Sequence, residues 1–367
     1  MKVALVHDDL VQWGGLERML LGISEIYPEA VIYTSVIDWE NPLIKEQFGV
    51  KKIKTSFLQK IPGWKILYKP LFALYPFVFE QFDLSGYDLV ISITTRFAKS
   101  VITKPEQRHL CYCYTPPRFL WNFQSDNVPI LARPILSSLR VIDRVSSVRV
   151  DHWIAGSKVA SSRIQKIYHQ PAVVVPGFVE VSDYSKWQAW DGNYFLVIAR
   201  LNEYKRVDLA IKAFNKFVKI RKEKKWRMRI IGTGPKLNDL YQMASSEIDF
   251  LGAVTEEVRM DILSGCSALI LPGEEDFGLT ALEAQATGKP VIAFGKGGVL
   301  ETVINKKTGL FFDQANEQSL LEALVLFCSS KFSSPEIKKN AAKFSKTRFK
   351  MKFSSAVDSL QDQPVDI

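Results

Sequence analysis

The sequence predicts an α/β protein made of two doubly wound halves, each built around a parallel sheet. Short apolar runs alternate with helical stretches, a pattern typical of strand–helix–strand units. The alternation occurs in two series, and 367 residues with 47% hydrophobic side chains suffice to bury two cores. Strands are expected at 2–6, 30–33, 89–93, 109–114, 153–155 and 172–175 in the first half, and at 194–199, 228–231, 249–251, 268–271 and 291–294 in the second.

The domain boundaries follow from where this alternation is interrupted. Residues 1–178 hold the first series and residues 193–345 the second, so each is predicted to be a Rossmann-like domain. Between them, residues 179–192 have little periodicity and are the best candidate for a linker. Residues 346–367 begin with a basic helix in which Phe349 and Phe353 are four positions apart.

Composition limits the class of protein without selecting one. The net charge of +9 suits nucleic acid, an anionic membrane surface or a phosphorylated substrate. The four cysteines form neither a zinc pattern nor a dense disulfide framework. The first strand reaches charge after four apolar residues, which is too short for a signal peptide, and no run approaches the ~20 apolar residues of a spanning helix. A cytoplasmic protein that is soluble or peripheral to the membrane is therefore expected.

The segment 60–79 combines basic residues with many aromatics and three prolines. Trp, Tyr and Phe beside Lys suit the headgroup boundary of a membrane, so this segment can rest on one. The alternative is a helical hairpin that packs its aromatics under the N-terminal sheet. Composition leaves both open.

Two glutamates on either side of a Phe-Gly turn form the most informative motif. Glu275 precedes Phe277 and Gly278, and Glu283 follows within a run of good helix formers. Gly278 is expected to end a hydrophobic strand, so that Leu279 and Thr280 open the helix. Amide groups at a helix start attract phosphate, while a carboxylate one turn in can accept hydrogen bonds from sugar hydroxyls. The motif therefore predicts a sugar-nucleotide site.

Two cations and a glycine turn support the same interpretation. Arg200 and Lys205 follow the strand 194–199, where they can neutralise a diphosphate and stabilise the charge that a leaving nucleotide gains during glycosyl transfer. Gly232 and Gly234 end another strand and allow backbone to approach a nucleotide closely, although a tight turn explains them equally well in isolation. Gly297 and Gly298 form a further glycine loop before a helix.

A turn with Gly14 and Gly15 follows the first strand and precedes an amphipathic helix, but it lacks the G-x-G-x-x-G spacing of dinucleotide oxidoreductases.

Together, the order of these motifs resembles that of retaining glycosyltransferases of family four. The resemblance spans nearly the whole chain. His7-Asp8 and the stretch 113–121 look most like the bacterial branch that builds O-antigen and exopolysaccharide, many of whose members are mannosyltransferases.

The resemblance implies a GT-B fold, in which two Rossmann-like domains face a central cleft, with the acceptor on the N-terminal side and the donor on the C-terminal side. The C-terminal helix is then expected to cross back to the first domain. Carried over by position, Arg200, Lys205 and Glu275 are the catalytic residues, and Glu283 binds the ribose. The other donor-binding residues are Gly15, Gly232, Gly234, Phe277, Gly278, Leu279 and Thr280.

The acceptor side departs from the family pattern at two positions. Tyr114 stands where the family often has a histidine, and a tyrosine with a pKa near 10 is a poor base at neutral pH. Gly156 stands where an asparagine commonly precedes the serine. His7 is expected to touch an acceptor hydroxyl, although a structural histidine is equally consistent with its place. Arg118, assisted by Lys99, is expected to bind an acceptor phosphate.

These observations predict an enzyme that moves a hexose, with mannose from GDP-mannose as the leading candidate, onto a lipid-linked saccharide or polysaccharide precursor. The resemblance implies a GDP- or UDP-sugar donor and no metal or other cofactor, and Arg200 and Lys205 can supply the positive charge instead. The acceptor brings the enzyme to the inner membrane face, and no nucleic-acid partner is expected. The alternatives are a nucleotide-sugar epimerase and a non-catalytic nucleotide-sugar-binding protein of the same fold.

Overall fold

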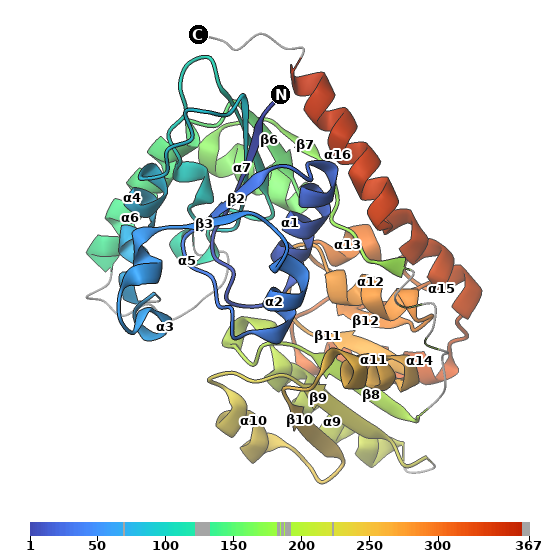
Figure 1. The fold of residues 1–367 in the computed structure, drawn as a ribbon. Helices are drawn as coiled ribbons and strands as arrows, with labels where there is room; N and C mark the ends of the chain where they lie inside the picture. Colours follow the sequence, from blue (N-terminus) through green and yellow to red (C-terminus); the bar gives the residue numbers. More distant parts are fainter. Residues whose placement is uncertain are drawn as a thin grey trace. The chain divides into compact units, whose positions relative to one another are not determined.

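The computed structural model describes residues 1–68, 70–121, 133–181, 184, 187, 192–221 and 224–361. The chain divides into two compact units: unit 1 comprises Met1–Gly177 and the C-terminal residues from Phe349, and unit 2 comprises Phe178–Arg348. Each unit contains one parallel sheet flanked by helices (Figure 1). The predicted fold class, α/β with two Rossmann-like units, is confirmed. Most of the predicted linker, 179–192, lies outside the described residues.

Unit 1 has a seven-stranded sheet in the order β3-β2-β1-β4-β5-β6-β7. The strand order reverses between β1 and β4, which pair directly, so their carboxyl ends border a topological switch point. The short strand β3 was not among the predicted strands. The bounds are β1 Val3–His7, β2 Val31–Thr34, β3 Ile53–Thr55, β4 Leu89–Thr94, β5 Arg108–Cys113, β6 His152–Ala155 and β7 Ala172–Val174.

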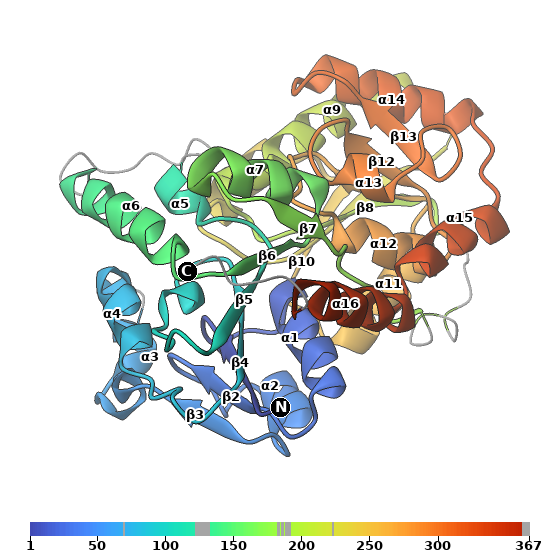
Figure 2. The ribbon, with the colours of Figure 1, turned by 90° about the horizontal axis from the view of Figure 1, so that it is seen from above.

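The helices of unit 1 cover this sheet. They are α1 Gly15–Ile26, α2 Pro42–Phe48, α3 Trp64–Leu67, α4 Tyr75–Glu80, α5 Arg118–Trp121, α6 Arg133–Ser147 and α7 Lys158–Tyr168, with 3-10 turns η1 Phe57–Lys60, η2 Pro70–Leu74 and η3 Ala98–Ser100. Helices α4 and α6 lie side by side in Figure 1 and Figure 2. An ion pair of 2.7 Å between Glu80, at the end of α4, and Arg149, just after α6, joins them.

The aromatic segment 60–79 forms α3, η2 and α4, with Lys69 outside the described residues. Tyr75 and Phe79 are buried in one cluster with Ala4 and Val6 of β1, so the packing alternative is confirmed for these rings. Other residues of the segment, including Ile66 and Phe77, are exposed. Among the described helices, none is long and apolar enough to cross a bilayer.

The C-terminal helix α16, Lys346–Gln361, ends within unit 1. The rings of Phe349 and Phe353 are buried, and their centroids lie 5.9 and 6.0 Å from that of Tyr112 on β5. The two phenylalanines that the sequence places four apart therefore anchor this helix through its apolar face.

Unit 2 has a six-stranded parallel sheet in the order β10-β9-β8-β11-β12-β13, with its switch point between β8 and β11. Its core includes Phe195 and Trp226, whose rings stack 4.9 Å apart. The last strand, β13, was not among the predicted strands. The bounds are β8 Tyr194–Ile198, β9 Arg227–Ile231, β10 Ile248–Gly252, β11 Ala268–Leu271, β12 Val291–Phe294 and β13 Gly309–Phe312.

The helices of unit 2 connect these strands. They are α9 Val207–Ile220, α10 Leu237–Met243, α11 Glu256–Gly265, α12 Leu279–Ala286, α13 Val299–Thr302, α14 Glu317–Ser329 and α15 Ser334–Ala341, with 3-10 turns η5 Glu203–Lys205 and η6 Ala342–Phe344. Because all the strands are parallel, η5, α11 and α12 follow strand carboxyl ends and begin at the same edge of the sheet.

Candidate functional site

The switch point of unit 2 brings Lys205 and Glu275 together. Lys205 lies in η5 after β8, and Glu275 lies in the loop after the neighbouring strand β11. The Lys205 ammonium donates a hydrogen bond of 2.7 Å to Glu275 Oε1. Their side chains are 18% and 17% exposed, so the pair is accessible yet partly shielded from water. Two residues separated by 70 positions thus form one charged pair where open α/β sheets bind ligands.

The loop between β11 and α12 differs from the sequence prediction. Gly278 was expected to end the strand, but β11 ends at Leu271, and residues 272–278 form a loop. Pro272 has no N–H to donate, which disfavours continuing the ladder. Gly278 has φ of +90° and stands immediately before α12. This longer loop carries Glu275 away from the end of the strand.

The glycine loop 295–298 holds the Glu275 loop by close backbone contact. The Gly298 N–H donates to the Glu275 carbonyl at 2.7 Å. A Cβ added at Gly298 would lie 2.3 Å from the Asp276 carbonyl oxygen and from Phe277 Cα, so no larger residue fits there. The glycine loop that the sequence shows before a helix therefore positions the Glu275 loop.

The start of α12 presents backbone groups at the same edge. Leu279 and Thr280 are partly exposed and lie in its first turn, where N–H groups face outward from the helix and favour an anion. The Phe277 side chain is buried, and its ring centroid lies 5.8 Å from that of Phe344. Phe277 belongs to the predicted donor segment, and its ring packs in the interior of unit 2.

Glu283 has a cation of its own, which the sequence did not reveal. Arg259, in the first turn of α11, donates from Nη1 to Glu283 Oε2 at 2.8 Å and from Nη2 to Oε1 at 3.4 Å. The Tyr184 hydroxyl donates to Glu283 Oε1 at 3.2 Å. Burial acts to lower the pKa of Arg259, but the charges of Glu283 and Glu256 outweigh burial and raise it. The one signal in the sequence that pointed to Arg259 was its spacing of three positions from Glu256 at the start of a helix.

Arg200 lies exposed just after β8, and its Nη2 donates to the Tyr204 hydroxyl at 3.2 Å. Gly232 and Gly234 follow the adjacent strand β9. A Cβ at Gly232 would lie 1.9 Å from the Ala199 carbonyl oxygen, so the glycine allows the two loops to touch. Close contact with the protein's own backbone therefore explains why position 232 is a glycine.

At the switch point of unit 1, Asp8 fixes the loop that follows β4. Its buried carboxylate accepts hydrogen bonds from Thr94 Oγ1 at 2.8 Å and from the N–H groups of Thr95, Phe97 and Ala98 at 2.7 to 2.9 Å. Burial acts to raise the pKa of Asp8, but the charge of Arg96 and these hydrogen bonds outweigh it, so the pKa is lowered. Asp8 is therefore a charged structural anchor.

His7 lies beside this anchor in a cluster of acidic residues. Its imidazole is fully buried, forms no hydrogen bond with the described residues, and lies 3.9 Å from Glu17 Oε1. Gly15 is the first residue of α1, which places Glu17 in the first turn. Asp9 pairs with Arg96, and its pKa is raised, first by burial and then by the charges of Asp8 and Glu17. His7 thus lies at the carboxyl end of β1, as predicted, and its side chain is buried inside unit 1.

The prediction that Lys99 assists an acceptor phosphate is wrong. Its side chain is 1% exposed and pairs with the equally buried Asp143 of α6. Its ammonium also donates to the Arg96 carbonyl at 2.9 Å, and Asp143 Oδ2 accepts from the Trp121 indole and the Tyr168 hydroxyl. This ammonium is held within the core of unit 1, where a soluble phosphate does not reach it.

Tyr114 and Gly156, the two departures from the family pattern, are in contact. A Cβ added at Gly156 would lie 3.2 Å from Tyr114 Cδ2, which is closer than side chains usually approach. The glycine therefore makes room for the tyrosine ring. Arg118 lies partly exposed at the start of α5.

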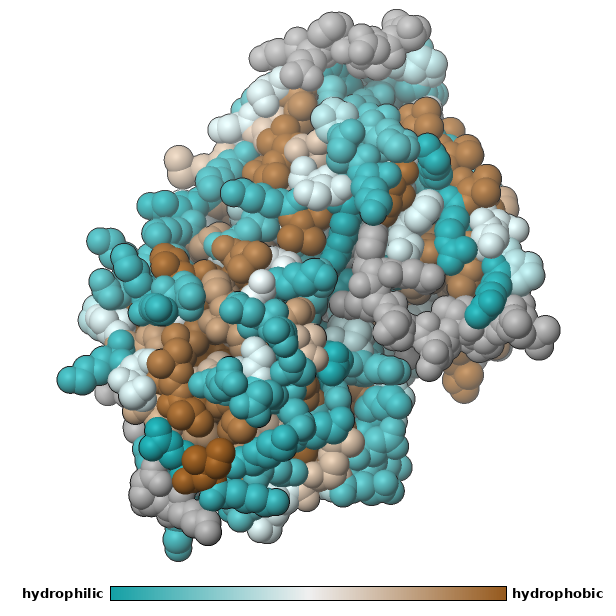
Figure 3. All heavy atoms as spheres, turned by 180° about the vertical axis from the view of Figure 1, so that it is seen from behind, coloured by the Kyte–Doolittle hydropathy of each residue, from teal (hydrophilic) through white to brown (hydrophobic). Residues whose placement is uncertain are grey.

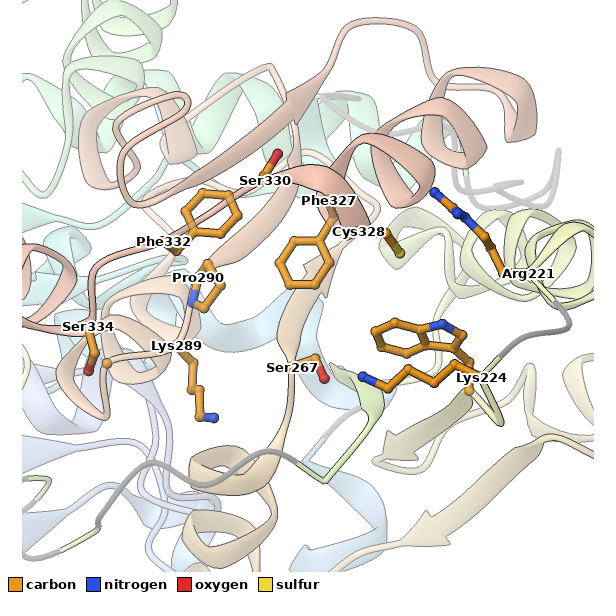
Figure 4. Close-up of a pocket in the computed structure, with 12 residues that line it drawn as sticks. Arg221, Lys224, Ser267, Lys289, Pro290, Phe327, Cys328, Ser330, Phe332 and Ser334 are labelled. Atoms are coloured by element: carbon orange, nitrogen blue, oxygen red, sulfur yellow. The ribbon is translucent and has the colours of Figure 1, made fainter.

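A separate depression of about 510 Å³ lies at the opposite, amino edge of the unit 2 sheet. Trp226, Ser267 and Pro290 immediately precede β9, β11 and β12, and Figure 4 shows Lys224 and Lys289 with their ammonium ends on either side of Ser267. None of the predicted site residues is among the described residues that line it. The site chemistry therefore belongs to the other edge of the sheet.

Comparison with known sequences shows a family similarity in the stretch that carries this carboxyl-edge site. Residues 185–344, which include Lys205, Glu275 and Glu283, match the family described as Glycosyl transferases group 1. This stretch is similar to a glycosyltransferase group 1 domain. The matched stretch contains the ion pair at the switch point and Arg259.

Relatives and solved structures extend the similarity beyond the matched stretch. The chain is 24% identical to the alpha-1,3/1,6-mannosyltransferase ALG2 of Dictyostelium discoideum, with 84% of this chain and 85% of that protein aligned. It is 23% identical to ALG2 of Mus musculus, over 98% and 94%. Its fold matches the lipopolysaccharide outer core galactosyltransferase WaaB, with a TM-score of 0.70, 16% identity and coverage of 98% and 99%. It also matches Anabaena HepE in complex with UDP, with a TM-score of 0.69, 14% identity and coverage of 98% and 100%. The GT-B type of fold is confirmed.

Proposed function

We propose that the protein is a retaining glycosyltransferase of family four that moves a hexose from a nucleotide diphosphate sugar to a lipid-linked saccharide or polysaccharide precursor. The observation that carries this proposal is the Lys205–Glu275 pair at the switch point of the stretch that is similar to a glycosyltransferase group 1 domain. An ammonium and a carboxylate at one strand edge offer one group for a diphosphate and one for sugar hydroxyls.

In the proposed reaction, the bond from the sugar to the diphosphate breaks as the acceptor oxygen bonds to the same carbon on the same face. The leaving phosphate takes the acceptor proton. Arg200 and Lys205 stabilise the negative charge that develops on the phosphate, and the N–H groups at the start of α12 add to this. Glu275 orients the sugar and Glu283 the ribose. Because these cations are present, we propose that transfer requires no metal.

For the donor, we propose a hexose, with mannose from GDP-mannose first and UDP-sugars second. The mannose proposal is supported by relatives named alpha-1,3/1,6-mannosyltransferase, and the UDP alternative by the fold match to HepE, solved with UDP. For the product, we propose O-antigen or a related polysaccharide. Arg118 and Tyr114 are proposed to contribute to the acceptor side in unit 1.

For the location, we propose a peripheral position at the inner face of the cell membrane, where a lipid-linked acceptor is found. Helix α6 supports this proposal. Val141 and Val145 are 63% and 58% exposed and lie four positions apart on this helix with Arg144 beside them, which suits an interfacial helix, and Val148, just after the helix, is 76% exposed. Apolar surface adjoins hydrophilic surface at the upper right of Figure 3, where unit 1 is seen from behind.

The test is to incubate the purified protein with GDP-mannose or a UDP-hexose, with and without lipid-linked saccharide acceptors, and to identify products by mass spectrometry and NMR. A glycosylated acceptor that retains the anomeric configuration of the donor supports the proposal. An isomerised sugar nucleotide formed without acceptor indicates an epimerase. Donor binding without any product across the panel indicates a binding protein, and either result overturns the proposed reaction.

A further inference from the structure

Arg259 connects three elements at the carboxyl edge of the unit 2 sheet. It lies in the first turn of α11, the helix that follows β10, and forms two hydrogen bonds to Glu283 on α12. It also donates hydrogen bonds to both carboxylate oxygens of Glu256, from Nη2 to Oε1 and from Nε to Oε2, the latter at 2.8 Å. The Arg259 and Glu283 side chains are 12% and 6% exposed. The guanidinium thus bridges two carboxylates beside the edge where the donor is proposed to bind.

The geometry constrains the Glu283 carboxylate in two respects. A planar guanidinium that contacts both carboxylate oxygens fixes the plane of the carboxylate, which a single point charge does not do. The negative charge of a buried carboxylate also needs a compensating cation, because burial disfavours the charged form. Arg259 therefore pairs with the Glu283 carboxylate and fixes its orientation.

We infer that Arg259 is a positioning residue for ribose recognition: it acts through Glu283 and sets how strongly the site distinguishes a ribonucleotide from one that lacks the ribose hydroxyls. This inference rests on the proposed role of Glu283 in binding the donor ribose. Recognition of hydroxyls by a buried acceptor is highly discriminating, because a ligand without them leaves polar groups unpaired. A carboxylate that loses its fixed plane loses this discrimination first.

A purely structural role for the pair predicts a different outcome. A structural ion pair holds α11 against α12, so its loss weakens every ligand of the site alike or lowers only stability. A positioning role predicts loss confined to ligands with ribose hydroxyls. Arg227 and Asp249 provide a matched control, because they form a two-bond arginine–carboxylate pair between β9 and β10 in the same unit, away from the site residues.

The experiment measures calorimetric affinities of GDP and 2′,3′-dideoxy-GDP, with the UDP pair in parallel, for the full chain and its variants. We expect Arg259→Gln to weaken binding of the ribonucleotide about tenfold and that of the dideoxynucleotide less than about twofold. Glu283→Gln should behave in the same way, and the double variant should be no weaker than either single one. Arg259→Lys, which keeps the charge but not the fork, should give an intermediate loss, and Arg227→Gln should bind like the wild type.

Equal weakening of both nucleotides by Arg259→Gln, or an unchanged ratio between them, overturns the inference while leaving the donor site in place. If Arg259→Gln does not fold, the ratio measured with Arg259→Lys decides in the same way. Failure of the wild type to bind GDP, UDP and their sugar conjugates instead overturns the proposed donor site, and this inference with it. The two failures are thus distinguished by the wild-type titration alone.

Discussion

Replacing Lys99 by Met separates a structural role from a role in acceptor binding. Met keeps the apolar stem and removes the ammonium, which leaves the Asp143 carboxylate buried without its cation. Removing one partner of a buried ion pair costs about 3–5 kcal/mol. Because Asp143 still accepts hydrogen bonds of 2.8 Å from Trp121 and 2.9 Å from Tyr168, we expect the lower end, about 3 kcal/mol.

The assay is native-state hydrogen exchange of the β4 and β5 amides, which reports the unfolding free energy of unit 1 separately from unit 2. The control is Lys52→Met, since Lys52 pairs with Glu29 at 3.3 Å on the surface of unit 1 and its loss should cost less than about 1 kcal/mol. The KM for the acceptor should stay within about twofold of wild type, because the ammonium does not reach the surface. An unchanged exchange free energy together with a tenfold rise in that KM would refute the reasoning.

Three further predictions concern the donor pair, the Tyr114 contact and a buried histidine. Lys205→Ala should lower kcat/KM at least about tenfold, or ~1.4 kcal/mol of transition-state binding, in steady-state transfer assays; unchanged kcat/KM contradicts its role. Gly156→Asn should lower the melting temperature because its side chain meets the Tyr114 ring, and adding Tyr114→His should restore part of the loss; additive losses would show that the positions are independent. Burial lowers the pKa of His109 from 6.5 to about 4. Its contribution to the free energy of unfolding is therefore complete above pH 6.5 and should fall by roughly 3 kcal/mol as the pH drops to 4. Denaturant unfolding of wild type and His109→Gln across this range checks the prediction, and parallel pH profiles would contradict it.

The fold class and the donor edge were predictable because they depend on local patterns. Alternating apolar strands and helices mark two parallel sheets, and residues that follow adjacent strands must meet at one edge. Lys205 and Glu275 could therefore be expected to come together, and their ion pair bears this out. The short strands β3 and β13 were missed because three or four residues carry too little periodicity to distinguish them from loops.

Contacts between residues distant in the sequence were not predictable in the same way. Arg259 has an ordinary neighbour in Glu256, and nothing in the chain connects it to Glu283, 24 positions away. Lys99 was misplaced for a related reason, because a lysine after a strand at the ligand edge is usually solvated, whereas here Asp143 from a distant helix compensates its burial. In each case the deciding partner comes from another element of the fold.

The most direct test of the donor site is hydrogen exchange of the protein with and without a nucleotide sugar, resolved by mass spectrometry. With GDP-mannose or a UDP-hexose at saturation, we predict protection of residues 199–205, which follow β8 and carry Lys205, and of residues 274–283, which comprise the loop with Glu275 and the start of α12. Protection confined to the depression around Lys224 and Lys289 at the amino edge, or no protection with any sugar nucleotide, would contradict the account.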